Sequence, residues 1–174
     1  MRIFRGSHVV RDPRDLVISG YEYHKTTKEG WCRKPNPRRM QGLSYQAELL
    51  KLSEHDGLMA EIDYVARRTA AEMAAWNYKQ AEFLEIRYED AFANETGTFE
   101  RLFRWYGFNE KGIEVGLEAV DRLSLKRGGA SPGHARSGEP GEWRSRFTVE
   151  HIERFKVLTG DLVFDLGYEA SRDW

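Results

Sequence analysis

The sequence has one cysteine, Cys32, and no apolar run that approaches the length of a membrane span. A single thiol forms no internal disulfide, and no cysteine cluster exists that would hold zinc. A transmembrane helix needs about 20 mostly apolar residues, and the first residues of the chain lack the apolar stretch of a secretory signal. These absences argue against a disulfide-stapled secreted domain and a membrane-spanning protein. They lead us to expect a cytoplasmic protein with no metal site.

Repeats and low-complexity tracts are absent as well. The 174 residues are 40% hydrophobic and 32% charged, a composition typical of a globular chain that buries its own core. The formal net charge of −1 argues against a partner that binds the whole molecule as a polycation, so no nucleic-acid polymer is expected. We predict a single domain over residues 1–174.

Positive charge is nevertheless concentrated in one segment. Residues 121–147 contain six lysines and arginines against three acids, and much of this segment is rich in Gly, Pro and Ser, as loops are. A locally basic loop in a nearly neutral protein favours a small anionic ligand over a long polymer.

Strand and helix signals alternate along the chain. Residues 3–10 and 83–88 have the length and composition of strands. The first of these leads into Asp12-Pro13, a favourable N-cap and first helical residue, which predicts a helix through about Tyr23. The longest helical stripe consists of residues at steps of three and four. Its members are Leu58, Ile62, Val65, Thr69, Met73 and Trp76.

Other helical faces are predicted over residues 99–106 and 113–120. Ser44 and Thr148 are candidate N-caps, and Thr148 is expected to open the last helix, which would extend to about Leu162. Residues 25–43 and 125–142 are predicted to be loops. These polar segments separate the helices and strands.

Alternating strands and helices predict an α/β layered fold. The two strands are few, because sheets usually hold about four to six. A parallel sheet of two strands is also poorly covered by itself. Either further strands escape the pattern, or the chain begins after the first strands of its domain.

The segment after the first strand, Arg11-Asp12-Pro13-Arg14-Asp15 with Ser19 downstream, is a candidate anion site. In open α/β sheets ligands bind beyond the carboxyl ends of the strands, and a helix N-terminus favours an anion there. The guanidinium fork of Arg11 is shaped for phosphate oxygens. The alternative is that Asp12-Pro13 merely starts a helix and that the arginines are solvated.

Two further segments carry candidate residues. In residues 136–143, glycines beside Arg136 would let the backbone approach a ligand and expose its amides, with Trp143 as the anchor to the core. The alternative there is an exposed loop without a ligand. In Ile86-Arg87-Tyr88-Glu89-Asp90, a strand end could place the Tyr88 ring near a nucleotide base, or it could be a core strand with a charged end.

In this order and spacing, the three segments resemble the sulfotransferase family that uses 3′-phosphoadenosine 5′-phosphosulfate (PAPS). Arg-Asp-Pro-Arg-Asp followed by Ser19 is similar to the family's 3′-phosphate motif. Arg-Ser-Gly-x-x-Gly-x-Trp-x-x-x-Phe-Thr, from Arg136 to Thr148, resembles its Arg-Lys-Gly-x-x-Gly-Asp-Trp-Lys-x-x-Phe-Thr motif. Tyr-Glu-Asp at a strand end is the family's middle landmark. The resemblance extends over nearly the whole chain.

The resemblance implies that the chain binds a nucleotide. Arg11 and Ser19 would hold its 3′-phosphate, and Arg136 with the backbone at Ser137 and Gly138 would complete that pocket. Ser137 stands where the family often has lysine, so one positive charge is missing there.

The base of the nucleotide has its own predicted contacts. Tyr88 would approach the adenine. Ser124 is followed by Leu125, which falls where a phenylalanine of the family often stacks on adenine. A leucine can pack against the base but cannot stack on it.

Two parts of the family pattern have no counterpart in this sequence. One is the loop of the type Pro-Lys-Ser-Gly-Thr-Thr-Trp that cradles the 5′-phosphosulfate, and the other is a histidine base upstream of the 3′-phosphate motif. The resemblance therefore implies a partial P-loop-like, three-layer α/β fold, helix-rich, with a parallel sheet flanked by helices but without its first strand and phosphosulfate loop. From this resemblance we expect an N-terminally truncated sulfotransferase-like domain.

The histidines identify no catalytic base. His8 lies in the first predicted strand, where a structural role is expected. His24 and His134 could line the cleft, but a place on the surface is the simpler expectation for both. The catalytic residues thus stay unassigned.

The activity implied by the resemblance is transfer of a sulfuryl group from PAPS to a hydroxyl or amine acceptor, with adenosine 3′,5′-bisphosphate (PAP) as product. Because the phosphosulfate half-site is missing, we expect this chain alone to be weakly active or inactive, with that half-site supplied upstream or in trans. An alternative is a non-catalytic PAP-binding remnant whose open sheet edge pairs with a partner or a second copy. Residues 25–57 could form a lid on the acceptor side or a solvated connection, and the acceptor itself is unidentified.

Overall fold

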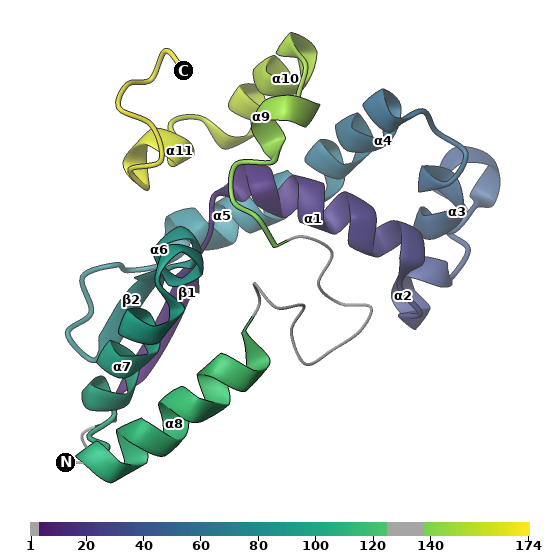
Figure 1. The fold of residues 1–174 in the computed structure, drawn as a ribbon. Coiled ribbons are helices and arrows are strands. Elements are labelled where there is room, and N and C mark those ends of the chain that lie inside the picture. Colours follow the sequence, from purple (N-terminus) through teal and green to yellow (C-terminus); the bar gives the residue numbers. More distant parts are fainter. Residues whose placement is uncertain (1–3, 125–137) are drawn as a thin grey trace. The chain divides into compact units, whose positions relative to one another are not determined.

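The computed structural model describes residues 4–124 and 138–174. Its fold is helix-rich α/β with a small parallel sheet, as the sequence predicts (Figure 1). The chain divides into two compact units, each made from two separate stretches of sequence. Unit 1 takes residues 1–11 and 77–140, and unit 2 takes residues 12–76 and 141–174. The prediction of one domain over the whole chain stays a prediction.

Unit 1 contains the sheet. Strand β1 (Gly6–Val10) pairs in parallel with β2 (Phe83–Arg87), with Gly6 opposite Phe83 and Val10 opposite Arg87. A side chain at Gly6 is excluded because an added Cβ would lie 2.5 Å from the Phe83 ring. Since the strands are parallel, their carboxyl ends meet at the same edge of the sheet, where Arg11 and Tyr88 follow them.

The described helices of unit 1 follow β2 in the chain. They are α6 (Tyr88–Ala93), α7 (Glu95–Trp105) and α8 (Glu110–Leu123). Helix α7 packs against both α8 and β2. The predicted strand over residues 83–88 is one residue too long, because Tyr88 begins α6. Glu89 and Asp90 lie in the first turn of that helix, where acidic side chains interact favourably with its dipole.

Unit 2 is helical over its described residues, with α1 (Pro13–Thr26) in contact with several other elements. These are α3 (Tyr45–Leu49), α4 (Glu54–Glu61), the π-helical turn η2 (Ile62–Ala66) and α9 (Trp143–Arg146). Helix α5 (Arg67–Ala75) continues from η2, and α10 (Val149–Thr159) packs on α4, η2 and α5.

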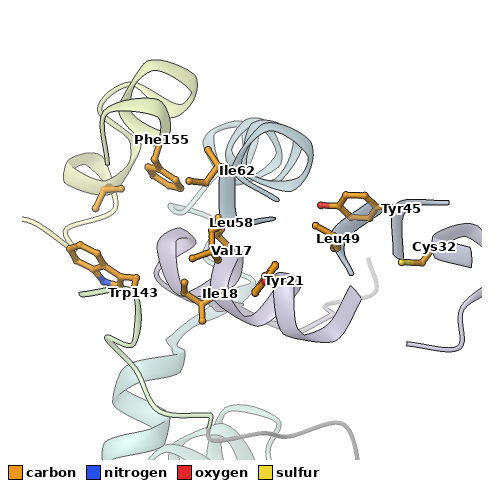
Figure 2. Packing of buried hydrophobic residues seen from close by; sticks show 12 residues of the cluster. Val17, Ile18, Tyr21, Cys32, Tyr45, Leu49, Leu58, Ile62, Trp143 and Phe155 are labelled. Carbon is orange, nitrogen blue, oxygen red and sulfur yellow. The ribbon is translucent and has the colours of Figure 1, made fainter. Parts of the chain in front are cut away.

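The hydrophobic core of unit 2 joins these helices. Figure 2 shows Val17 of α1 beside Leu58 of α4, with the Phe155 ring directed toward Ile62. Twelve buried residues form this cluster. They are Val17, Ile18, Tyr21, Cys32, Tyr45, Leu49, Leu58, Ile62, Ala66, Trp143, Phe155 and Val163. Trp143 thus anchors its segment on the core, as the sequence predicts.

The predicted stripe from Leu58 to Trp76 is correct at its start and shifts at η2. Leu58 and Ile62 are fully buried. Among the side chains described beyond them in this stretch, Ala66 and Ala70 are buried, whereas Thr69, Met73 and Trp76 of the stripe are only half-buried. A π-helical turn contains one residue more than an α-helical turn. The buried face therefore moves by one residue after Ile62.

Local capping signals are confirmed. The side chains of Asp12 and Ser44 accept hydrogen bonds from the N–H groups of Arg14 and Ala47, and Thr148 forms a capping box with His151. Helix α1 ends at Thr26 rather than near Tyr23.

Besides α6 and α9, further short elements of the described residues were not predicted. Helix α2 (Gly30–Arg33) and the 3-10 turn η1 (Met40–Gly42) lie inside the predicted loop of residues 25–43. The predicted last helix ends at Thr159, and Leu162 begins a separate helix, α11 (Leu162–Asp165). Gly160, with φ of +57°, separates the two. None of the described helices is long and apolar enough to cross a bilayer.

Candidate functional site

Two of the predicted site residues meet at the carboxyl edge of the sheet in unit 1. Arg11 follows β1 and Tyr88 follows β2, directly after the paired residues Val10 and Arg87. The guanidinium carbon of Arg11 lies 4.4 Å from the centre of the Tyr88 ring. This edge is where open α/β sheets bind ligands.

Gly138 completes this group, and we call Arg11, Tyr88 and Gly138 the Arg11 cluster. The Tyr88 hydroxyl donates a hydrogen bond of 2.8 Å to the Gly138 carbonyl, and Nη2 of Arg11 donates a long one, 3.5 Å, to the Glu139 carbonyl. Gly138 has φ of +66°, and an added Cβ would lie 3.0 Å from the Tyr88 hydroxyl. Both the backbone conformation and the close contact therefore favour glycine at this position.

Arg11 retains hydrogen-bonding capacity. Its Nε is buried and has no hydrogen-bond partner among the described residues. A buried donor left without an acceptor is unfavourable by about 1–3 kcal/mol. A guanidinium packed on a ring can still present its edge to carboxylate or phosphate oxygens. The Arg11 cluster can therefore bind a small anion.

Of the other predicted residues, Ser124 makes a different contact, and several lie beyond the described residues. Ser124 is buried at the end of α8, and its hydroxyl donates to the carboxylate of Glu95. Its observed contact thus joins α8 to the start of α7. Leu125, Arg136 and Ser137 lie outside the described residues, as does His134.

In unit 2, the N-terminus of α1 contains an arginine that is not solvated. Arg14 is fully buried, with 0% of its surface exposed. Its guanidinium donates from Nη2 to Asp12 at 2.7 Å and from Nη1 to Glu169 at 2.6 Å. It also lies 3.7 Å from the centre of the Trp143 ring and 4.5 Å from that of Trp174. The solvated alternative is therefore wrong for Arg14.

Asp15 connects two of the sequence motifs within unit 2. Its carboxylate accepts hydrogen bonds from the N–H of Gly141 at 2.6 Å and from the N–H of Trp143 at 3.1 Å. The Arg-Asp-Pro-Arg-Asp segment and the Gly-x-Trp segment are thereby joined. Ser19, farther along α1, is exposed to solvent.

His24 is buried, which corrects the expectation of a surface position. Its Nδ1 lies 2.9 Å from a carboxylate oxygen of Glu61, which is itself fully buried. The Tyr45 hydroxyl donates to the same carboxylate at 2.5 Å. Burial, together with the charge of Glu61, raises the pKa of Tyr45 far above its usual value. Burial likewise raises the pKa of the Cys32 thiol, which disfavours the reactive thiolate.

The remaining described histidines have structural contacts. His8 in β1 lies 2.7 Å from the carboxylate of Glu85 on β2, as an ion pair or hydrogen bond across the sheet. His151 accepts from the N–H of Thr148 in the capping box of α10. Over residues 4–124 and 138–174, no group of three or more His, Cys, Asp or Glu side chains is placed to hold a metal ion.

Sequence reasoning missed Arg14, Asp15, Glu169 and Trp174 as members of a network. The two acids of the Arg-Asp-Pro-Arg-Asp segment were a signal, because an acid in the first turn of a helix often accepts backbone N–H groups. No local pattern indicated that Glu169 and Trp174 would reach Arg14.

Comparison with known proteins supplies independent information. A sulfotransferase domain family matches residues 8–167, whereas no curated protein matches the sequence. The mouse sulfotransferase SULT7A1 complexed with PAP has a TM-score of 0.56 and 15% identity, over 93% of this chain and 59% of its own. A retinol dehydratase in complex with androsterone and inactive cofactor PAP has a TM-score of 0.49 and 19% identity, over 92% of this chain and 48% of its own.

This chain therefore spans less than two thirds of the length of either solved structure. At such low identity, the likeness to the mouse protein shows the fold alone. The family match shows more than the fold, because it covers most of the chain. It runs from His8 in β1 beyond α11 and includes the segments around Arg11, Tyr88 and Gly138. On that match, this chain belongs to the sulfotransferase domain family.

Proposed function

We propose that this chain binds PAP and PAPS as the nucleotide-binding part of a sulfotransferase. The Arg11 cluster carries the proposal, because it holds, at the ligand edge of a parallel sheet, an arginine whose buried Nε has no hydrogen-bond partner in the part of the chain that the structure describes. PAP-bound structures with the same fold support the choice of nucleotide. The proposed contacts are Arg11, Ser19, Tyr88, Ser124, Leu125, Arg136, Ser137 and Gly138.

The chemistry of the cluster suits the 3′-phosphate. Arg11 would supply charge-assisted hydrogen bonds, which are about twice as strong as neutral ones. The Tyr88–Gly138 hydrogen bond would hold the start of the glycine segment beside Arg11. Ser19 would add a hydroxyl donor, and Arg136 with the amides of Ser137 and Gly138 would complete the contacts.

When bound, PAPS supplies the sulfuryl group, which passes from the 5′-phosphate oxygen to a hydroxyl or amine of the acceptor. The bond from sulfur to the phosphate oxygen breaks, PAP leaves, and the acceptor gives up a proton. This chain's own residues would contribute binding and orientation of the nucleotide. Because the sequence holds no segment similar to the phosphosulfate loop, we propose that turnover by this chain alone is weak or absent.

The test is a calorimetric titration of the folded chain with PAP, using 5′-AMP as the ligand that lacks the 3′-phosphate. We expect PAP to bind more tightly than 5′-AMP, and PAP binding to weaken at least about tenfold in Arg11→Ala and Arg136→Ala, the loss of one charge-assisted hydrogen bond. Arg5→Ala is a matched control, because Arg5 also lies over a ring, that of Trp105 at 5.2 Å, at the opposite end of β1. Equal affinity for PAP and 5′-AMP would contradict the proposed site.

Catalysis is tested separately by following release of PAP from PAPS in the presence of a panel of hydroxyl and amine acceptors. Absence of turnover with intact PAP binding agrees with the proposal. Robust turnover by the 174-residue chain would show that it needs no additional phosphosulfate half-site.

A second candidate function is a PAP-binding module that pairs with another polypeptide along its sheet. Val9 of β1 is 57% exposed and Phe4 is 60% exposed. Among the described strands, β1 has β2 as its neighbour on one edge, and an uncovered strand tends to find partners. Sedimentation analysis over a range of concentrations tests it, and a monomer at all of them would argue against self-association.

A further inference from the structure

Two residues beyond the family match contact Arg14, which belongs to the segment that resembles the 3′-phosphate motif. The match ends at residue 167, yet Glu169 and Trp174 both contact Arg14. We infer that Glu169 and Trp174 are positioning residues for the 3′-phosphate site, acting through Arg14. This inference rests on the proposed function and adds a part of the chain that the family match does not include.

Arg14 cannot itself be the phosphate ligand in this structure, because it is fully buried and each of its three nitrogens already donates to a carboxylate. Asp12 accepts hydrogen bonds from Nε at 2.9 Å and from Nη2 at 2.7 Å, and Glu169 accepts one from Nη1 at 2.6 Å. The rings of Trp143 and Trp174 lie over the guanidinium. A buried charge needs partners of opposite charge such as these two carboxylates. Its role is therefore to hold its neighbours in place.

Trp174 is itself held in position. Its carbonyl accepts a hydrogen bond from Nζ of Lys156 on α10. Its ring packs at 6.0 Å from that of Trp143 and at 6.2 Å from that of Phe155, which is fully buried. The ring is thus attached to the core of unit 2 and not only to Arg14.

Arg14 and the residues in contact with it belong to the two segments that resemble the family's 3′-phosphate motif and its Arg136–Thr148 motif. Asp12, which pairs with Arg14, is the N-cap of α1. Trp143, which stacks on Arg14, donates its backbone N–H to Asp15 in the first turn of α1. Trp143 also belongs to the motif that runs from Arg136 to Thr148. Glu169 and Trp174 therefore stabilise the arrangement in which the helix N-terminus and the Gly-x-Trp segment are held together.

The contacts of Arg14 determine which part of nucleotide binding should depend on Glu169 and Trp174. Loosening Arg14 would release the cap of α1 and the Gly141–Trp143 amides, and the proposed 3′-phosphate ligands are neighbours of these groups in the chain. The proposed adenine contacts at Tyr88 and Ser124 belong to other elements. Loss of the positioning residues should thus weaken recognition of the 3′-phosphate and leave the rest of the nucleotide contacts unchanged.

The experiment measures PAP and 5′-AMP affinity by calorimetry in Trp174→Ala and Glu169→Gln. We expect PAP affinity to fall about tenfold, within the range known for residues that act on a site without touching the ligand, and 5′-AMP affinity to stay unchanged. Amide hydrogen exchange at Gly141 and Trp143 should become faster. Trp174→Phe keeps a ring over Arg14 and should restore most of the PAP affinity.

Arg172→Ala is the matched control. Arg172 lies in the same segment, but its ion pair is with Asp161 and both side chains are at least half exposed. It should change neither affinity nor exchange. The inference is overturned if Trp174→Ala keeps full PAP affinity, or if PAP and 5′-AMP affinities fall together. A folded wild-type protein that does not bind PAP would overturn the proposed function itself, and the inference with it.

Discussion

Gly20 of α1 faces the buried carboxylate of Glu61 so closely that a Cβ atom on Gly20 would lie 2.5 Å from Oε1. That oxygen also lies 2.9 Å from Nδ1 of His24. The absence of a side chain at residue 20 therefore creates the space in which the Glu61 carboxylate reaches His24 and Tyr45.

The first prediction concerns this close approach. Gly20→Ala should destabilise the fold by about 2 kcal/mol, as overpacking of a tight interior does, because Glu61 must move from its two partners. Denaturant unfolding measures the effect. Gly30→Ala is the control, since a Cβ there meets nothing within 4 Å. Equal stability of both variants and the wild type would show that Glu61 has room to shift.

The second prediction concerns pH. Burial and Glu61 raise the pKa of Tyr45 in the folded state, so the folded protein keeps this proton at a pH where the unfolded chain loses it. The contribution is fully present below the unfolded pKa of about 10, and it declines above that pH by about 1.4 kcal/mol per pH unit.

Tyr45→Phe isolates this contribution. At pH 8 the variant should be less stable than the wild type by about 1–3 kcal/mol, because the buried Glu61 carboxylate loses a donor. Between pH 10 and 11 the difference should shrink. Melting temperatures of the two proteins measured side by side provide the test, and a difference that is constant from pH 8 to 11 would contradict it.

The third prediction concerns two arginines that contact the same ring and the same acid. Arg14 is fully buried over Trp143 and paired with Glu169. Arg144 lies 4.5 Å from the centre of the same ring and 4.0 Å from the same acid, but its side chain is 61% exposed. Arg14→Met should cost about 3–5 kcal/mol because the buried Asp12 carboxylate loses its guanidinium partner. Arg144→Met should change stability by less than about 1 kcal/mol. Urea unfolding compares them, and similar small effects would show that Asp12 relaxes into water.

Features that depend on neighbouring residues were predictable from the sequence. The caps Asp12, Ser44 and Thr148 act on N–H groups two or three residues away, so their residue types are sufficient signals. The strands around Val10 and Ile86 were likewise indicated by their own composition.

Features that depend on distant residues or on a change of helical period were not predictable. The π-helical turn at Ile62–Ala66 shifts the buried face, and no residue type in this turn indicates a π-helix. Arg14 looked solvated because Glu169 and Trp174 are remote in the sequence. For the candidate site, the structure brings Arg11 and Tyr88 together because the strand ends of a parallel sheet share one edge, and Tyr88 contacts Gly138, whereas the binding role of these residues stays a prediction. The partner of Ser124, Glu95, had no such signal.

The last prediction separates backbone strain from the proposed binding role of Gly138. Gly138 and Gly107 both have positive φ, +66° and +81°, but a Cβ at Gly107 meets nothing within 4 Å whereas one at Gly138 would lie 3.0 Å from the Tyr88 hydroxyl. Both alanine variants should therefore lose about 1–2 kcal/mol of stability from the left-handed conformation.

Only Gly138→Ala should also weaken PAP binding, by about tenfold, the equivalent of one charge-assisted hydrogen bond. The added methyl group displaces the Tyr88 hydroxyl from the Gly138 carbonyl, to which it donates at 2.8 Å, and Arg11 packs on that same ring. Calorimetric titration of both variants, at a temperature where both are folded, measures the difference. If PAP affinity is the same in the two variants, the Arg11 cluster is a structural contact of unit 1 and the phosphate is bound elsewhere.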